Sequence, residues 1–526
     1  MSQKDKEEWS RMWASASFVG VLIIIGLPLW WKTTEVYRVS LPYDKMSSLS
    51  AHAHSVLEEV TVLAADEATA AEVAGMLEQS AQHADIINLR VHKKLLPPAL
   101  HQSLGVVADD QEALEAVLEA LGGAPDQLLV VQRPVLRQHV WVADESVVFF
   151  RDAKASQTLA RVLTSWIYQL PVLRDSVAAR AAQAPRRTRF PPSARYHIVL
   201  SVVHPDPAGA DVRFDAGDAV EDYIGTFVDE LSELHNFTLK SQWIHLLDFN
   251  FQAKEVADTS DWGRHFAVRE DRLHLLLTKL EERLATRVSP EPAINLVLYL
   301  QPCHTAPLRI YDQNDKPIDS AIQAFMSPKW GGVVLAAPTV ADCRGRGRAW
   351  APPVRAVMGA FLAQLRPLLG IVETEPIEGA YLEPLRSVVP RRWERRALLR
   401  TRALDQLTSA ALTLESLAQL LGEISNIVIN DKVGESISSA VEGIEIASEL
   451  LRRGELRGAY DESLAAWREA EAAFTDPSLL ALLYFPDDQK YAIYIPLFLP
   501  IMFPVILSIK ALLLWFRGKS TKEKTE

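Results

Sequence analysis

Two long uncharged segments near the two ends of this 526-residue chain constrain its fold more than any other feature. The first spans residues 12–31 and the second residues 491–509. At about 1.5 Å of rise per helical residue, either segment can cross a hydrocarbon core of about 30 Å. The second segment continues past Lys510, whose long side chain can reach the interface, into an apolar run ending at residue 516. We therefore predict transmembrane helices at 12–31 and 491–516.

Flanking charges predict the orientation of these helices, because Lys and Arg gather on the cytosolic side. Four basic residues follow the second helix, whereas Lys490 is preceded by two aspartates. We expect cytosolic tails at 1–11 and 517–526, with the region between the helices lumenal or extracellular. A cleaved signal peptide is the alternative for the first helix, but its apolar stretch ends in Trp30 and Trp31 instead of a small-residue cleavage site.

The composition excludes several classes of protein. Apolar residues make up 48% of the chain and charged residues 23%, a balance that allows buried cores and argues against extensive disorder. The net charge is −12, which provides no broad positive field for nucleic acid. Two cysteines are too few for a disulfide-dense scaffold or a four-cysteine zinc site.

Short apolar β-type runs alternate with helical segments over roughly residues 60–340. The expected strands are 86–91, 128–131, 147–150, 198–203 and 294–300, and the expected helices include 66–82, 112–121 and 219–235. This alternation predicts an α/β fold with a substantially parallel sheet over residues 32–394. A Pro- and Arg-rich linker at 184–192 suggests a subdivision there.

The pattern changes to long helices from about Arg395. Apolar residues recur at steps of three and four over residues 404–421 and again over 437–451, which predicts a helical hairpin. A further helix is expected at about 456–474. We therefore predict a helical region at 395–475, whose apolar seams suit packing within the chain or against another molecule.

Three sets of residues are candidates for modification or contact. Asn236 begins the triplet Asn-Phe-Thr, a glycosylation sequon in the region assigned to the lumen. Cys303 and Cys343 can pair in an oxidising compartment, although the sequence does not set their separation. A third set recurs every four residues in the second transmembrane helix and lies on nearly one face. It consists of Pro496, Pro500 and Pro504.

This proline face has two interpretations. Each proline lacks an N–H and removes a hydrogen bond from the preceding turn, so the helix should be kinked there. The kink can pack only on the first transmembrane helix, or the face can dock against helices of a partner subunit or border a lipid-accessible groove.

Common catalytic motifs are missing from the sequence. We find no Walker loop, His-Glu-x-x-His, Gly-x-Ser-x-Gly or strand-linked Gly-x-Gly-x-x-Gly. Cys303 and His304 are adjacent, but adjacent side chains of a strand point to opposite faces. We therefore assign no catalytic, cofactor-binding or metal-binding residues and expect no cofactor.

Several segments resemble the PIG-S family, the S subunits of the glycosylphosphatidylinositol (GPI) transamidase. They occur in family order from the first transmembrane helix to the last, so the resemblance extends over nearly the whole chain. The segments are GLPLWWKTTEVYR at 26–38, SPKWGG at 327–332, LAQLLG at 417–422 with ISNIVI at 424–429, and DPSLL at 476–480 through YFPDDQK at 484–490 into IPLFLP at 495–500.

The resemblance implies a non-catalytic, membrane-anchored accessory subunit in the endoplasmic reticulum. Together with the flanking charges, this places both termini in the cytosol and the large domain in the lumen. The complex of that family removes a C-terminal signal from a precursor protein and attaches a GPI anchor to the new carboxyl end. In that family PIG-K, the thiol-protease subunit, performs the chemistry. The implied partners are PIG-K, PIG-T, PIG-U, the GAA-type subunit and membrane lipid, without nucleic acid.

Two other functions remain open from the residues alone. One is a stand-alone lumenal thiol hydrolase that uses Cys343 or Cys303. The other is an unrelated membrane-tethered lumenal binding protein.

Overall fold

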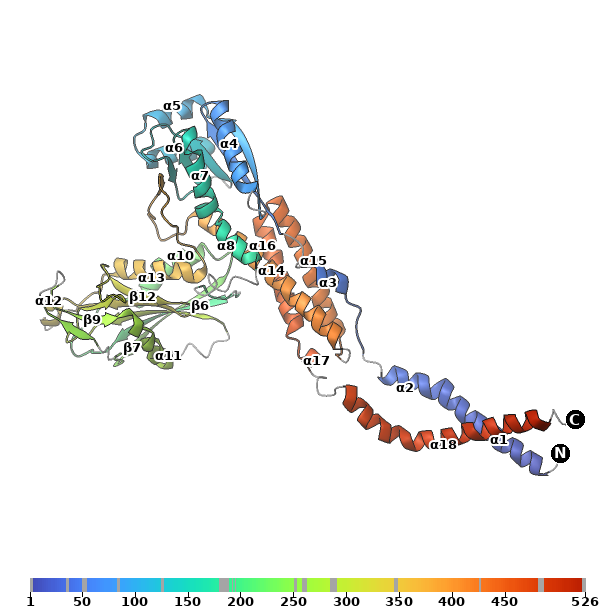
Figure 1. The fold of residues 1–526 in the computed structure, drawn as a ribbon. Coiled ribbons are helices and arrows are strands. Elements are labelled where there is room, and N and C mark those ends of the chain that lie inside the picture. The colour runs from blue at the N-terminus through green and yellow to red at the C-terminus, as the bar shows by residue number, and fades with distance from the viewer. Residues whose placement is uncertain are drawn as a thin grey trace. The chain divides into compact units, whose positions relative to one another are not determined.

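The computed structural model divides into two compact units, each formed from segments distant in sequence. Figure 1 shows the helices and strands of the chain. The α/β unit comprises Ala53–Asp405 and Ala447–Asp461, and the helical unit comprises Met1–His52, Gln406–Ile446 and Glu462–Glu526. The structure describes residues 3–34, 37–49, 54–82, 86–123, 127–178, 189–191, 193, 195–249, 253–257, 263–283, 291–344, 349–424, 427–480 and 487–522.

A six-stranded sheet forms the first layer of the α/β unit, with strand order β14-β4-β5-β3-β1-β2. Its neighbouring strands are parallel except for β4 and β5, which are antiparallel. Four consecutive residues are buried in both β3 and β5, as expected for strands covered on both faces. The strands are β1 (Val56–Ala64), β2 (Ile87–Leu95), β3 (Leu128–Gln132), β4 (Val140–Val142), β5 (Val147–Phe150) and β14 (Ala380–Leu382).

Helices connect the parallel strands of this sheet. Helix α4 (Glu67–Gln82) lies between β1 and β2 in the chain, and α5 (Pro98–Val106) and α6 (Asp110–Leu121) lie between β2 and β3. Helix α6 shows the local signals that set its ends. The Asp109 carboxylate accepts a hydrogen bond from the Gln111 amide, and a left-handed glycine follows the last turn.

A second, five-stranded sheet has the order β12-β13-β10-β6-β7. Strands β7, β6, β10 and β13 are parallel, and only the edge strand β12 is antiparallel to its neighbour. A small sheet, β11-β9-β8, shares a hydrophobic core with it. The strands are β6 (Arg195–His204), β7 (Asn236–His245), β8 (Lys254–Val256), β9 (His265–Arg269), β10 (Ala293–Leu300), β11 (Leu308–Tyr311), β12 (Gln323–Ser327) and β13 (Gly331–Ala336).

The other helices of the α/β unit complete its layers. Helix α13 packs on β13, and its C-terminal end leads to the cavity described below. The α-helices are α7 (Ser156–Val162), α8 (Leu170–Val177), α9 (Ala216–Ala219), α10 (Thr226–Asp229), α11 (His274–Arg283), α12 (Val340–Arg344) and α13 (Val354–Leu369). Short π-helical segments, Leu163–Ile167 and Val220–Gly225, and 3₁₀ turns, Ala153–Ala155 and Glu270–Arg272, continue some of them.

Long helices form the C-terminal region. Helix α14 (Arg392–Glu423) contributes residues to both units, as do α15 (Asp431–Arg453) and α16 (Leu456–Phe474). Within the helical unit, Gly443 lets α15 approach α16 closely, since a Cβ there would lie 3.0 Å from the Ala466 Cβ. The unit also contains α3 (Tyr43–Ser48) and α17 (Pro477–Leu480).

One helix of the described residues is long and apolar enough to cross a membrane, over Trp9–Leu29. This stretch lies within a continuous helical segment that is made of α1 (Gln3–Val21), a π-helical segment (Leu22–Gly26) and α2 (Leu27–Thr34). Helix α18 (Asp487–Lys522) packs against α1 and bends by 51° between Ala492–Pro500 and Met502–Trp515. Helix α18 is a second candidate for a membrane span only if its two arms are counted together as one span.

The predicted mixed α/β region followed by helices is confirmed. All five strands expected from apolar runs coincide with strands, and the helix expected at about 456–474 coincides with α16. The substantially parallel sheet structure expected here takes the form, among the described residues, of two larger sheets and a small one. The linker at 184–192 was predicted to subdivide this region. Its residues 184–188 and 192 lie outside the described part of the chain.

Candidate functional site

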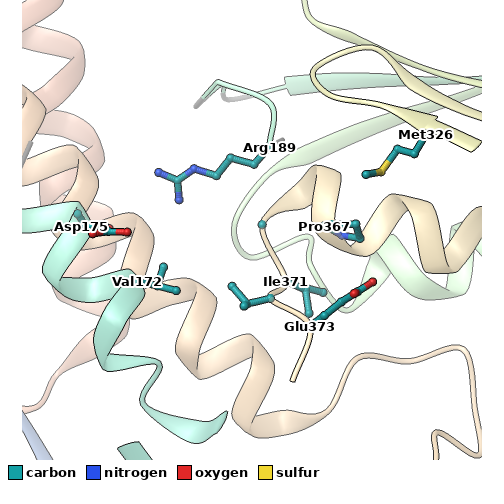
Figure 2. A pocket seen from close by; sticks show the side chains of 10 residues that line it. Val172, Asp175, Arg189, Met326, Pro367, Ile371 and Glu373 are labelled. Atoms are coloured by element: carbon teal, nitrogen blue, oxygen red, sulfur yellow. The ribbon is translucent and has the colours of Figure 1, made fainter. Parts of the chain in front are cut away.

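A cavity of about 410 Å³ lies in the α/β unit, beside the C-terminal end of α13 (Figure 2). Its walls come from four segments: α8, the segment around Arg189, β12, and the end of α13 with the chain that follows. Most of the lining is apolar, as is usual for sites that bind small molecules. The lining residues are Val172, Asp175, Ser176, Arg189, Met326, Pro367, Gly370, Ile371, Val372 and Glu373.

Gly370 determines the course of the chain at this cavity. It caps α13 in the left-handed region, with φ +99°, where a residue with a Cβ is strained. Its amide and that of Ile371 both donate to the Arg366 carbonyl, at 3.1 and 2.9 Å. This reversal brings residues 371–373 into the cavity wall, opposite the side chains of α8.

Two arginines lie close to this glycine. Arg189 lines the cavity and forms an ion pair with Asp405. Arg402 is fully buried and donates to the Leu369 carbonyl at 3.0 Å. Burial lowers the pKa of the Arg402 guanidinium, and the neighbouring charge of Arg189 lowers it further. The Asp405 carboxylate pairs with Arg189, and its charge partly offsets the lowering of the Arg402 pKa.

The same helix, α14, carries a second buried ionic contact. Arg400 forms an ion pair with Glu58 of β1, and both side chains are almost completely buried. The guanidinium also lies 5.2 Å from the ring centroid of Tyr168. Burial raises the pKa of the Tyr168 hydroxyl, so the ring remains neutral. This contact fixes α14 against the first sheet.

A third set of contacts connects the start of α14 with the first sheet and with α13, the helix that packs on the second sheet. Arg391 donates from Nε to Asp144, in the β4–β5 turn, at 2.9 Å and from Nη1 to Glu394 at 3.0 Å. Glu394 also accepts from Arg366 of α13 at 2.5 Å. Burial raises the pKa of the Asp144 carboxyl, and Arg391 opposes that rise. The first turns of α14 thus join the first sheet to the helix that covers the second.

The structure places the sequon and the cysteines at opposite ends of one sheet. Asn236 is exposed at the start of edge strand β7, whereas Cys303 follows the carboxyl end of β10, which runs parallel to β6 and β7. Cys303 and Cys343, whose pairing the sequence left open, form a disulfide with Cα atoms 5.7 Å apart. With both sulfurs in this bond, neither cysteine is a thiolate nucleophile.

The three prolines are in α18, and their side chains are exposed among the described residues. The 51° bend separates the arm that contains Pro496 from the arm that contains Pro504. A bend at prolines follows from the missing N–H groups and the clash with the preceding turn.

The described residues contain no group of three or more His, Cys, Asp or Glu side chains arranged to hold a metal ion. The lining of the cavity in Figure 2 includes neither His nor Cys. Its polar groups, which include Asp175, Arg189 and Glu373, can orient a ligand.

Comparison with known proteins decides the family. The model of the family "PIG-S: Phosphatidylinositol-glycan biosynthesis class S protein" matches residues 17–519. The chain belongs to the PIG-S family. It is 33% identical to the human "GPI-anchor transamidase component PIGS", over 98% of this chain and 97% of the human protein. The rat protein of the same name is 32% identical, with 94% of both chains covered.

A distant relative extends the same relationship. The "GPI transamidase component PIG-S homolog" of Schizosaccharomyces pombe is 23% identical, over 94% of this chain and 83% of its own length. The resemblance of the sequence to the PIG-S family is thereby confirmed. The cavity, the α14 contacts and the disulfide all lie within the matched residues 17–519.

Sequence reasoning missed the cavity and the buried contacts of this PIG-S family member. One signal was available for the contacts: six arginines occur within residues 391–402, interleaved with Trp393 and three aliphatic residues. A helix with so many arginines among apolar residues cannot keep all of them in solvent, so some need buried partners. The cavity had no such signal, because its walls come from four separate segments.

Proposed function

We propose that this chain is a non-catalytic, membrane-anchored accessory subunit of the GPI transamidase of the endoplasmic reticulum. In this role it supports assembly of the complex that attaches GPI anchors to the C-termini of precursor proteins. The observation that carries the proposal is the family match over residues 17–519, with relatives named as transamidase components over nearly their whole length.

Membership of a complex requires partners, for which we propose PIG-K, PIG-T, PIG-U, the GAA-type subunit and membrane lipid. Catalysis is assigned to PIG-K. The disulfide supports this division of labour, because it occupies both sulfurs that a stand-alone thiol hydrolase could use. A family match along nearly the whole chain also leaves no support for an unrelated tethered binding protein.

For the topology we propose two spans, at 12–31 and 491–516, with cytosolic tails at 1–11 and 517–526. Residues 32–394 and 395–475 then form the lumenal α/β and helical regions. The apolar helix over Trp9–Leu29 and the apolar arms of α18 support this arrangement. The basic residues after 516 support the cytosolic side of the C-terminal tail.

Affinity purification in mild detergent tests the assignment. The tagged full chain should recover a stoichiometric thiol-protease subunit, whereas an unrelated tagged two-span membrane protein of the same compartment should not. Equal recovery with both baits, or no recovery, would contradict the proposal.

Protease protection tests the topology separately. In sealed microsomes an added protease should shorten the chain only by its short tails, and digestion of the α/β unit should require detergent. Loss of that unit without detergent would overturn the orientation.

A further inference from the structure

A smaller cavity, of about 210 Å³, lies at the carboxyl ends of β10 and β13 in the second sheet. In sheets of parallel strands this edge is where ligands bind. The backbone N–H of Gln301 donates to the Ala336 carbonyl at 2.9 Å, which holds the two strand ends together at the cavity. The lining residues are Gln301, Pro307, Leu308, Arg309, Ser320, Ala321, Ile322, Gln323, Val334, Leu335, Ala336, Ala337, Pro353 and Val357.

The Gln301 side chain lies in the wall of this cavity and carries a donor that lacks a partner among the described residues. It is only 4% exposed and belongs to the lining. Its Oε1 accepts from the Leu308 amide at 2.8 Å, which fixes the orientation of the amide group, since a backbone N–H can only donate. The opposite atom, Nε2, has no hydrogen-bond partner among the described residues. Buried donors are almost always satisfied, so this one requires an acceptor.

The amino-terminal end of α13 forms another part of the wall. Pro353, the N-cap, and Val357 line the cavity, and the cap residue provides no side-chain hydrogen bond. The first turn of this 16-residue helix contains no acidic residue, so the turn itself carries no carboxylate to offset the partial positive charge of the helix end. Arg309 is the only charged side chain in the described lining. The remaining walls are mostly apolar.

We propose that this cavity binds an oxyanion, a carboxylate or phosphate group, that carries a short apolar moiety. The Gln301 Nε2 donates to one oxygen of the ligand. Arg309 and the start of α13 supply the positive field, as at other helix N-termini that bind anions. The aliphatic walls hold the apolar part. The same chemistry occurs at a peptide C-terminus and at a lipid phosphate, and the test below separates the two sources.

Titration calorimetry on the detergent-solubilised full chain tests the proposal with three probes: 3-methylbutanoate, its uncharged amide and inorganic phosphate. We expect at least one anion to bind at least tenfold more tightly than the amide. Tighter binding of 3-methylbutanoate identifies a carboxylate ligand, and tighter binding of phosphate identifies a phosphate ligand. If neither anion binds at millimolar concentration, water is the occupant and the proposal is overturned. Equal binding of the anions and the amide also overturns it.

Two variants locate the bound anion. Gln301→Glu keeps the acceptor for the Leu308 amide but replaces the donor with a carboxylate oxygen, so affinity should fall at least tenfold. Ala321 lines the cavity but is exposed, so Ala321→Phe does not alter a buried position. The phenyl ring should fill part of the cavity and weaken binding of the anion. Gln102→Glu makes the same charge change at an exposed position of α5 and should bind normally. Unchanged affinity in both cavity variants would overturn the assignment.

Discussion

Arg400 donates to a single oxygen of Glu58 from Nε and Nη2, at 2.8 and 2.7 Å, across 342 residues of sequence. The two side chains are 1% and 3% exposed. A buried ion pair of this kind adds little net stability over an apolar pair, but removal of one partner leaves an uncompensated charge.

Arg400→Met should therefore destabilise the α/β unit by about 3–5 kcal/mol, as measured by denaturant unfolding of the purified chain. Glu58→Gln combined with Arg400→Met should recover part of this loss, because both charges are then absent. Lys45→Ala provides the control. Its pair with Glu445 is more than half exposed and should contribute less than about 1 kcal/mol. If Arg400→Met and Lys45→Ala lower the free energy of unfolding equally, the importance assigned to the buried ion pair is contradicted.

Loss of the disulfide should affect stability before it affects transamidation. Cys303→Ser and Cys343→Ser each open a crosslink with a sequence separation of 40, which should cost about 2–4 kcal/mol. Turnover per assembled complex should remain near normal, and the double variant should resemble either single one. Full assembly with abolished turnover in a single variant would instead assign chemistry to the thiol.

Asn236 should carry a glycan, because the sequon is exposed at the start of edge strand β7. Asn236→Gln should lose one endoglycosidase-sensitive mobility step in microsomes. Thr238→Ser keeps the sequon and should retain the step. Identical mobility of wild type and Asn236→Gln would show that the site is not used.

His235, next to the sequon, should make the fold sensitive to acid. Burial, aided by the charge of Arg402, lowers the pKa of His235 from 6.5 to about 3, so the folded protein holds the ring neutral. Between pH 6.5 and 3 the unfolded chain binds a proton that the folded chain does not. Stability from this residue is therefore present above pH 6.5 and falls by about 1.4 kcal/mol per pH unit below it.

Unfolding free energies measured from pH 7.5 to 5 should show this slope in the wild type and a reduced slope in His235→Gln. The exposed His304→Gln serves as the control and should keep the wild-type slope. A wild-type slope in His235→Gln would refute the assignment.

The proline face of α18 should contribute to partner choice. Replacement of Pro496, Pro500 and Pro504 with Leu should straighten the 51° bend while membrane insertion and glycosylation persist. Co-purification of the other subunits should weaken. A control that changes exposed Leu507, Leu513 and Leu514 to Ala leaves the prolines in place and should assemble normally. Normal assembly and GPI attachment in the proline variant would leave only the kinked-anchor interpretation.

Local patterns predicted the elements that are regular along the chain. The run Val147–Phe150 became β5 with unchanged bounds, because a short apolar run in a covered sheet needs no polar partner nearby. Strand β1 was missed, since Glu58 and Glu59 interrupt its apolar run. Glu58 is buried because Arg400 and Arg396 meet it from α14, and no local window contains these contacts.

The sites were harder to predict for the same reason. The larger cavity joins α8, Arg189, β12 and the end of α13, so its existence depends on how distant segments pack. The separation of Cys303 and Cys343 depends on the order of β10 and β13 in the sheet. Asn236 was recognisable because a sequon is local, although its position at the edge of a sheet was not.

The segment enclosed by the disulfide has a consequence for maturation. Between Cys303 and Cys343 lie β11, β12 and β13, and with them most of the wall of the smaller cavity. Before oxidation these strands are held to the rest of the sheet only by hydrogen bonds and packing. After oxidation the chain can no longer open this loop without also opening the strand ends beside β10. An oxidising compartment thus adds a covalent bond that closes the segment carrying most of the smaller cavity's wall, and this bond distinguishes mature copies from newly made ones.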